Sequence, residues 1–130
     1  MERRQANVHP RVIVVDDDKD TVDMLALILR DAGYVVHSVY SGKDVLPAAR
    51  VFRPDAIILD ISVPGISGYA VAQQIRHSFV DARRPLMIAI TGKWVETPDR
   101  MIAEQCGFDH HLLKPCAPDA VLGLLKPLTG

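Results

Sequence analysis

The chain has 130 residues, of which 48% are hydrophobic and 24% charged, and its 15 basic and 16 acidic residues leave a formal net charge of −1. This length suits one domain with its own core, because single domains are most often about 100–150 residues long. The balanced charge excludes a broad basic surface for nucleic acid or anionic membrane, and no apolar run approaches the roughly 20 residues that span a bilayer.

The first third of the chain begins with a polar segment and then alternates between apolar and amphipathic runs. Residues 1–10 predict a loose N-terminal arm. Residues 12–15 are β-branched and lack a polar face, which is typical of a strand buried on both sides. Apolar side chains at helical spacing predict a helix over residues 21–32, and Gly33 is suited to end it in a left-handed conformation. A second strand is expected at residues 34–39.

The middle of the chain continues the alternation. Ser41 is placed to cap a helix that contains Pro47, and we expect this helix to be kinked, short or irregular because proline removes a backbone hydrogen bond. Residues 56–59 predict a third buried strand. Turn residues at positions 64–68 indicate a loop, and a helix through Tyr69, Ala72 and Ile75 follows it.

The last third of the chain adds two more strands and two more helices. Residues 86–90 predict the fourth strand, and a helix is expected from Pro98 to Cys106. Residues 108–113 give a weaker fifth strand, and residues 119–125 give the last helix. We assign residues 11–126 to one domain and residues 127–130 to a C-terminal tail.

Five strands that alternate with five helices predict an α/β fold with a doubly wound parallel sheet and helices on both faces. In such sheets ligands bind beyond the carboxyl ends of the strands. Those ends carry polar residues here: Asp16 and Asp17 after the first strand, Asp60 after the third, Thr91 after the fourth and Lys114 after the fifth. The parallel sheet would bring them to one edge.

Each of these residues also has an ordinary structural interpretation. Asp18 or Asp20 suits a helix cap, a lone threonine at a strand end is commonly a turn residue, and a lone lysine before proline is commonly solvated. Asp16 and Asp17 are harder to explain as caps, because adjacent like charges repel. The joint placement at successive strand ends favours a functional site.

The chemistry of the set points to phosphate. Clustered carboxylates repel unless a cation offsets their charge, and oxygen-only ligands suit Mg²⁺. A carboxylate beside the metal can attack a phosphoryl group, whose oxygens then need cationic or hydrogen-bonding partners. The Lys114 ammonium and the Thr91 hydroxyl are candidates for that role. The set predicts phosphoryl acceptance on an aspartate.

Four segments of the sequence resemble the receiver domain of two-component response regulators. They are Val-Ile-Val-Val-Asp-Asp-Asp, Ile-Ile-Leu-Asp-Ile-Ser-Val-Pro-Gly-Ile-Ser-Gly, Ile-Ala-Ile-Thr-Gly and Leu-Leu-Lys-Pro, in the order and spacing of that family. The resemblance covers residues 11 to about 126. It implies a flavodoxin-like sheet with strand order 2-1-3-4-5 and a signalling switch that is not an enzyme in its own right, although it assists its own phosphorylation and dephosphorylation.

The resemblance also implies roles for single residues at the phosphorylation centre. Asp60 would accept the phosphoryl group from a histidine kinase or a histidine phosphotransfer protein. Asp17 would be the main ligand of Mg²⁺, with Asp16 acting largely through bound water. Asp60 and the backbone carbonyl of Ser62 would complete the metal ligands. Lys114 would pair with the phosphoryl group.

The resemblance implies three further positions around this centre. Thr91 would be the switch hydroxyl, and the bond before Pro115 would be cis. His111 stands where the family usually has a switch tyrosine or phenylalanine, and its imidazole is interpreted as a replacement for that ring, with pH sensing as the alternative. An effector is expected on the face formed by the fourth helix, the fifth strand and the fifth helix, with its output in another molecule or in sequence outside this chain.

Two other functions compete with the switch. A phosphatase of the haloacid-dehalogenase type would use Asp16 as nucleophile and Asp18 as general acid, but it needs a late acidic pair, and only Asp119 follows Lys114. The other is a binding module that works without phosphorylation, which the intact acidic set disfavours.

The cysteines bear on the compartment in which the protein works. Cys106 and Cys116 lack the paired spacing of a zinc site, so they are interpreted as reduced thiols. Residues 1–7 also lack the apolar stretch of a secretory signal. The expected location is cytoplasmic, without contact to membrane or nucleic acid by this domain.

Overall fold

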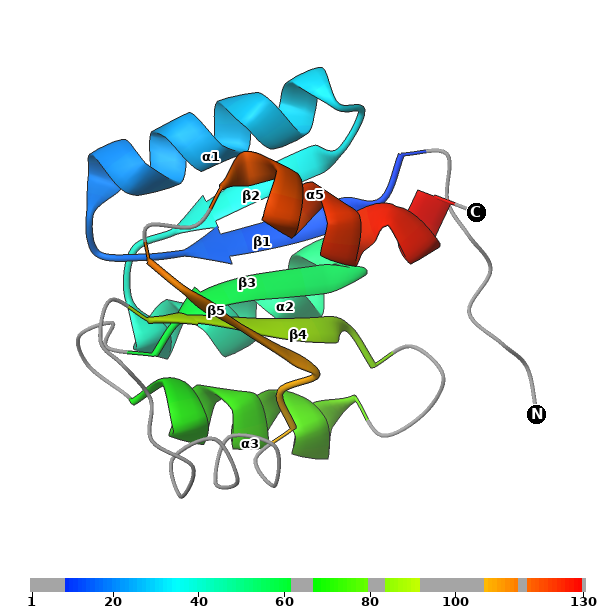
Figure 1. Ribbon diagram of the computed structural model, residues 1–130. Helices are drawn as coiled ribbons and strands as arrows, with labels where there is room; N and C mark the ends of the chain where they lie inside the picture. Colours follow the sequence, from blue (N-terminus) through cyan, green and yellow to red (C-terminus); the bar gives the residue numbers. More distant parts are fainter. Residues whose placement is uncertain (1–8, 62–66, 80–83, 92–106, 115–116, 130) are drawn as a thin grey trace.

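The computed structural model of the protein describes residues 9–61, 67–79, 84–91, 107–114 and 117–129, which form a parallel α/β sheet with helices on both faces (Figure 1). The strands are β1 (Arg11–Val15), β2 (Val35–Val39), β3 (Ala56–Asp60), β4 (Leu86–Thr91) and β5 (His110–Leu113). The α-helices are α1 (Lys19–Asp31), α2 (Val45–Phe52), α3 (Gly68–Ser78) and α5 (Pro118–Leu125), with 3-10 helices η1 (Gly42–Asp44) and η2 (Lys126–Thr129).

The sheet has the order β2-β1-β3-β4-β5, and every pair of neighbouring strands runs parallel. This confirms the predicted doubly wound sheet. The helix predicted from Pro98 to Cys106, the two cysteines and most of the predicted arm lie outside the described residues. No helix in the described segments is long and apolar enough to cross a membrane.

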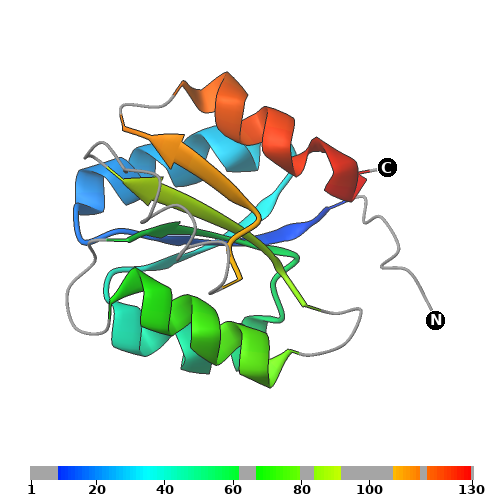
Figure 2. The same cartoon turned by 60° about the horizontal axis from the view of Figure 1, so that its bottom comes forward.

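Helices α1 and α5 cover one face of the sheet, and α2 and α3 cover the other (Figures 1 and 2). The side chains of β1 alternate between the two resulting cores. Val12 and Val14 pack with α1 and α5, whereas Ile13 and Val15 pack with α2 and α3. A strand covered on both faces has no polar side, which explains why the run at 12–15 shows no alternation.

The ends of α1 are set by side-chain and glycine caps. The helix begins two residues before the predicted start, because the Asp18 side chain accepts a hydrogen bond from the Asp20 backbone amide at 3.2 Å. Gly33 adopts a φ of 101°, as predicted. The Tyr34 amide still donates to the Leu29 carbonyl at 3.0 Å, so β2 starts one residue later than expected.

Pro47 is the third residue of α2 and so lies in its first turn. Amides in the first turn have no acceptor inside the helix, which makes proline tolerable there. The helix is short, at eight residues, and a single 3-10 turn, η1, precedes it. The prediction of a short or irregular helix is therefore confirmed.

Gly68 joins the start of α3 to the end of β3. Its amide donates to the Ile61 carbonyl at 3.0 Å, and a Cβ at this position would lie 2.6 Å from the Ile61 Cα. Such a contact is shorter than backbone atoms tolerate, so only glycine allows this approach. The close contact fixes the chain one residue after Asp60.

Gly68→Ala is therefore expected to lower the free energy of unfolding by about 1–3 kcal/mol, the usual cost of overpacking. The matched control is Gly123→Ala in α5, where no described atom lies within 4 Å of the added Cβ. That change is expected to be neutral or to stabilise by about 0.5–1 kcal/mol, because alanine favours helix. Urea titrations of both variants measure the difference, and equal effects would contradict the argument.

Candidate functional site

The carboxyl ends of the strands bring the predicted polar residues to one edge of the sheet. Asp16 directly follows β1, Asp60 is the last residue of β3, Thr91 is the last residue of β4, and Lys114 directly follows β5. The strand ends therefore converge as the sequence predicted. The exposed Asp17 lies beside them, and the predicted Ser62 and Pro115 lie outside the described residues.

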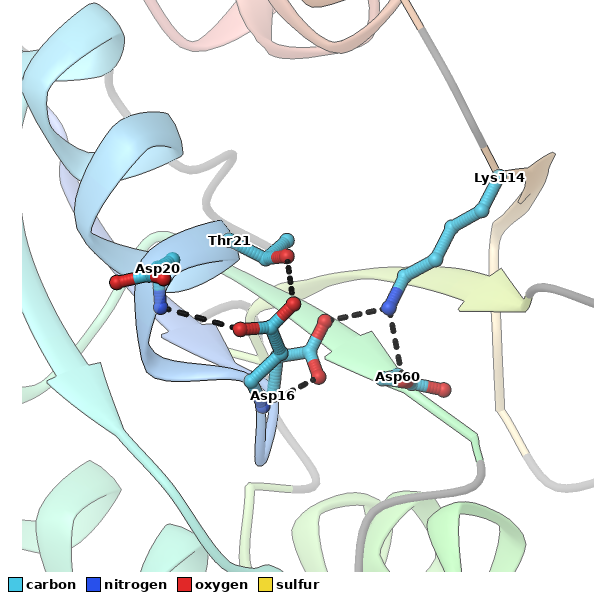
Figure 3. A network of polar contacts seen from close by, with 6 residues as sticks. Asp16, Asp20, Thr21, Asp60 and Lys114 are labelled. Carbon is cyan, nitrogen blue, oxygen red and sulfur yellow. Dashed lines mark hydrogen bonds and ion pairs between the residues drawn. The ribbon is translucent and has the colours of Figure 1, made fainter.

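The Lys114 ammonium lies between two carboxylates (Figure 3). Its Nζ atom is 2.5 Å from Asp16 Oδ2 and 3.0 Å from Asp60 Oδ2. Asp16 and Asp60 are only 4% and 5% exposed. The ordinary interpretation of Lys114 as a solvated surface residue is wrong.

Backbone hydrogen bonds hold the ends of these strands in place. The Lys114 amide donates to the Thr91 carbonyl at 2.7 Å, and the Asp16 amide donates to the Val39 carbonyl at 3.2 Å. Asp16 Oδ1 also accepts from the Asp18 amide at 3.1 Å. The charged groups are thus fixed relative to the sheet before any ligand arrives.

Burial and ion pairing act against each other on the charged groups. Burial raises the pKa of Asp16 above its usual value, helped by the negative charge of Asp60, and the hydrogen bond from Lys114 offsets only part of this rise. For Lys114, burial would lower the pKa, but hydrogen bonds and attraction from Asp16 and Asp60 outweigh it, so its pKa lies above the usual value. Lys114 is consequently a cation at neutral pH.

Asp18 has a structural task. It caps α1, and the Thr21 hydroxyl donates to its Oδ2 at 2.7 Å, which lowers the pKa of Asp18. Of the two cap candidates in the sequence, Asp18 rather than Asp20 takes the position. Thr21 was missed, although a hydroxyl residue three positions after a helix-capping aspartate is a recognisable signal.

Three carboxylates are placed to share a cation. Asp16, Asp17 and Asp60 each offer an oxygen, and these oxygens all lie within 4.8 Å of one another. An oxygen-only set of this kind fits Mg²⁺, which binds proteins through few carboxylates and keeps several waters. Lys114 alone cannot neutralise three negative charges. The remaining negative charge favours the binding of a divalent cation.

A pocket of about 460 Å³ adjoins these charges and runs between α1 and α5. Asp16, Asp60, Lys114 and Thr21 line it, and the rest of its wall is apolar. No residue pattern in the sequence indicated this pocket, because it depends on how the two helices pack on the sheet.

His111 lies on the opposite face of the sheet from this pocket. It pairs in register with Ala89, whose side chain belongs to the core under α2 and α3. The imidazole is 5.9 Å from the Phe108 ring, which in turn makes an edge contact with Tyr69 at 6.4 Å. The predicted switch position therefore belongs to an aromatic row that leads to the start of α3.

Comparison with known proteins gives a consistent result. A family model described as the response regulator receiver domain matches residues 12–126. The DNA-binding response regulator MtrA of Mycobacterium tuberculosis is 31% identical over 116 residues, which cover 89% of this chain and 49% of MtrA. The transcriptional regulatory protein BaeR of Escherichia coli is 32% identical over 119 residues, which cover 92% of this chain and 48% of BaeR. The chain spans about half the length of these relatives.

Solved structures agree with the fold. The chemotaxis response regulator CheY4 of Vibrio cholerae superposes with a TM-score of 0.82 at 25% identity, over 92% of this chain and 98% of CheY4. A putative response regulator from Chloroflexus aurantiacus gives a TM-score of 0.81 at 28% identity, over 93% of this chain and 98% of that chain.

The raised pKa of Asp16 predicts a pH-dependent stability. The neutral carboxyl is favoured in the folded state, so its contribution is fully present below the usual pKa of 3.8 and is lost as the pH rises through the folded-state pKa. Without Mg²⁺, Asp16→Asn should therefore gain stability relative to wild type as the pH rises from 3.5 toward neutrality.

Urea titrations from pH 3.5 to 8 measure this difference. Asp20→Asn, an exposed change in the first turn of α1, is the control and should show no such growth with pH. If wild type instead gains stability relative to Asp16→Asn over this range, the pairing with Lys114 outweighs burial and the account is wrong.

Proposed function

The chain belongs to the family of response regulator receiver domains, and we propose that Asp60 is the residue on which it accepts a phosphoryl group. Receiver domains act as phosphoacceptor signalling switches and are generally not enzymes. The observation that carries the assignment is the place of Asp60 at the end of β3, between β1 and β4, where it faces both the Asp16 edge and Thr91 and has the Lys114 ammonium 3.0 Å from its Oδ2. Asp60 also pairs in register with Ile90, which puts Thr91 at the end of the adjacent strand.

We propose that the phosphoryl group is transferred in line. A carboxylate oxygen of Asp60 attacks phosphorus while the bond to the leaving group breaks, and negative charge accumulates on the three equatorial oxygens. Lys114, held protonated by its two carboxylate neighbours, is placed to donate to one of these oxygens. The Thr91 hydroxyl is assigned to another. Such pre-positioned charge accelerates transfer because the Lys114 ammonium is already beside the acceptor before the step.

Receiver domains bind Mg²⁺ at an acidic pocket, and the carboxylates of Asp16, Asp17 and Asp60 fit one here. We assign Asp17 and Asp60 as direct ligands and Asp16 as a ligand acting largely through water. The backbone carbonyl of Ser62 completes the proposed set. When bound, Mg²⁺ supplies positive charge that offsets the carboxylates and the phosphoryl oxygens.

Transmission of the signal is assigned to Thr91 and His111. A shift of Thr91 toward the phosphoryl group would open space near His111, which lies on the adjacent strand in register with Ala89. The aromatic contacts of His111 with Phe108, and of Phe108 with Tyr69, connect this position to the start of α3, so a rotation of the His111 ring would change the packing there. The outcome is a two-state equilibrium that phosphorylation biases.

Membership in the receiver family implies two kinds of partner, a phosphoryl donor and an effector. We propose a histidine kinase or a histidine phosphotransfer protein as the donor, and an effector that docks on the face including β5 and α5. In the described part of that face, β5 forms an edge of the sheet and Leu113 is 46% exposed. We place the receiver domain at residues 11–126, between an arm at 1–10 and a tail at 127–130, and we propose a cytoplasmic location.

Incubation with Mg²⁺ and acetyl phosphate is expected to add one phosphoryl group to the wild-type protein. Asp60→Asn removes the nucleophilic oxygen and should lower the initial labelling rate about 100-fold or more. Intact-protein mass spectrometry measures the rate. Asp20→Asn changes an exposed carboxylate near the site without touching the three-carboxylate cluster, and it should label like wild type. Labelling that survives in Asp60→Asn but disappears in Asp16→Asn would support a phosphatase-type nucleophile instead.

Mg²⁺ is expected to stabilise the folded protein. At a concentration ten times the dissociation constant, binding adds about 1.4 kcal/mol to the free energy of unfolding. Asp17→Asn is an exposed change that removes one proposed ligand, and a tenfold weaker affinity would reduce the gain to about 0.4 kcal/mol at the same concentration. Thermal or urea unfolding with and without Mg²⁺ measures both gains. Equal stabilisation of wild type and Asp17→Asn would contradict the ligand assignment.

A further inference from the structure

The pocket between α1 and α5 is polar at one end and apolar along the rest of its length. Its polar end contains Asp16, Asp60, Lys114 and Thr21. Its apolar wall comes from β1, β3, β4 and both helices: Val14, Val15, Met24, Leu25, Ile28, Ile58, Ile90, Pro118 and Val121. A ligand that fits this distribution has one charged end and one hydrocarbon end.

The exposure of the residues that line the pocket increases from its buried floor to its open rim. Ile58 and Val121 are 1% and 0% exposed, whereas Met24 on α1 is 66% exposed. The volume of about 460 Å³ lies in the range of small-molecule sites, roughly 300–1,000 Å³. A chain of a few carbons would enter past Met24 and replace water against the partly exposed side chains of Leu25 and Ile28.

The charged end suits a phosphoryl group once a cation is bound there. Two carboxylates and one ammonium line it, so any anion meets repulsion from Asp16 and Asp60 unless a cation offsets their charge. A phosphoryl group has the positive partners of the proposed phosphorylation centre, namely Lys114 and the cation of the carboxylate cluster. Figure 3 shows Thr21 and Lys114 on either side of the space above Asp16, in the direction of α5.

We propose that this pocket binds the acyl chain of an acyl phosphate, so that the site accepts small phosphodonors with short apolar chains in preference to acetyl phosphate. The inference rests on the proposed function of Asp60 and adds the class of donor. In the step, an Asp60 oxygen forms a bond to phosphorus and the bond between phosphorus and the acyl oxygen breaks. The acyl group leaves as a carboxylate with the electron pair of that bond, so no proton or redox partner is required.

Acetyl, propionyl and butyryl phosphate form the test series. Each buried methylene contributes about a fourfold gain in affinity, so the second-order labelling rate should rise about fourfold per added carbon. The rates are measured with Mg²⁺ by intact-protein mass spectrometry. Equal rates for acetyl and butyryl phosphate on the wild-type protein would overturn the proposal.

Two matched tryptophan variants on α1 locate the effect. Met24→Trp fills the rim of the pocket and should lower the ratio of butyryl to acetyl rates toward one. Leu27 is similarly exposed, at 60%, but does not line the pocket, so Leu27→Trp should keep the wild-type ratio. An unchanged ratio in Met24→Trp, or the same loss in Leu27→Trp, would overturn the proposal.

A binding measurement separates this inference from the proposed function. Butylphosphonate and methylphosphonate carry a carbon–phosphorus bond that cannot be transferred, and both are titrated into ¹⁵N-labelled protein with Mg²⁺. Butylphosphonate alone should shift the amide signals of Leu25, Ile28 and Val121. If no acyl phosphate labels the protein, the proposed function fails. The amide shifts then still test whether the pocket binds an apolar chain. The absence of such shifts overturns the pocket assignment even where acetyl phosphate labels Asp60.

Discussion

The site depends on one ammonium group held between two buried carboxylates. Lys114 lies 2.5 Å from Asp16 and 3.0 Å from Asp60, and without this cation the two buried carboxylates would repel each other. Burial nevertheless keeps the pKa of Asp16 raised, so the hydrogen bond from Lys114 offsets only part of the effect of burial. One ammonium also faces three carboxylates, so negative charge remains at this edge. The remaining charge is what allows the same edge to accept a divalent cation and then a phosphoryl group.

The rest of the fold keeps these groups at fixed positions. β1 and β3 are buried between two layers of helices, so the strands that carry Asp16 and Asp60 cannot shift without disturbing both cores. The backbone amide of Lys114 donates a hydrogen bond to the Thr91 carbonyl, which holds the lysine at the end of β4. Gly68 anchors α3 directly behind the end of β3. Because these groups are already held in place, little reorganisation energy is needed when a phosphoryl donor binds.

Much of this arrangement could be predicted from the sequence because parallel strands buried on both faces leave an unmistakable apolar pattern. Once β1, β3, β4 and β5 are placed, Asp16, Asp60, Thr91 and Lys114 must meet at one edge. The sequence could not choose between Asp18 and Asp20 as the cap of α1, since that depends on where the helix starts. It also gave no sign of the pocket between α1 and α5, which arises from packing between segments about 90 residues apart. The roles assigned to Ser62 and Pro115 stay predictions.

The most direct test of the account is to identify the residue that carries the phosphoryl group. Borohydride reduces an aspartyl phosphate to homoserine, and peptide mass spectrometry then locates the reduced residue. After treatment with acetyl phosphate and Mg²⁺, we expect homoserine at position 60, with unmodified aspartate at positions 16 and 17. Homoserine at position 16 or 17, or a labelled protein with aspartate intact at position 60, would contradict this expectation.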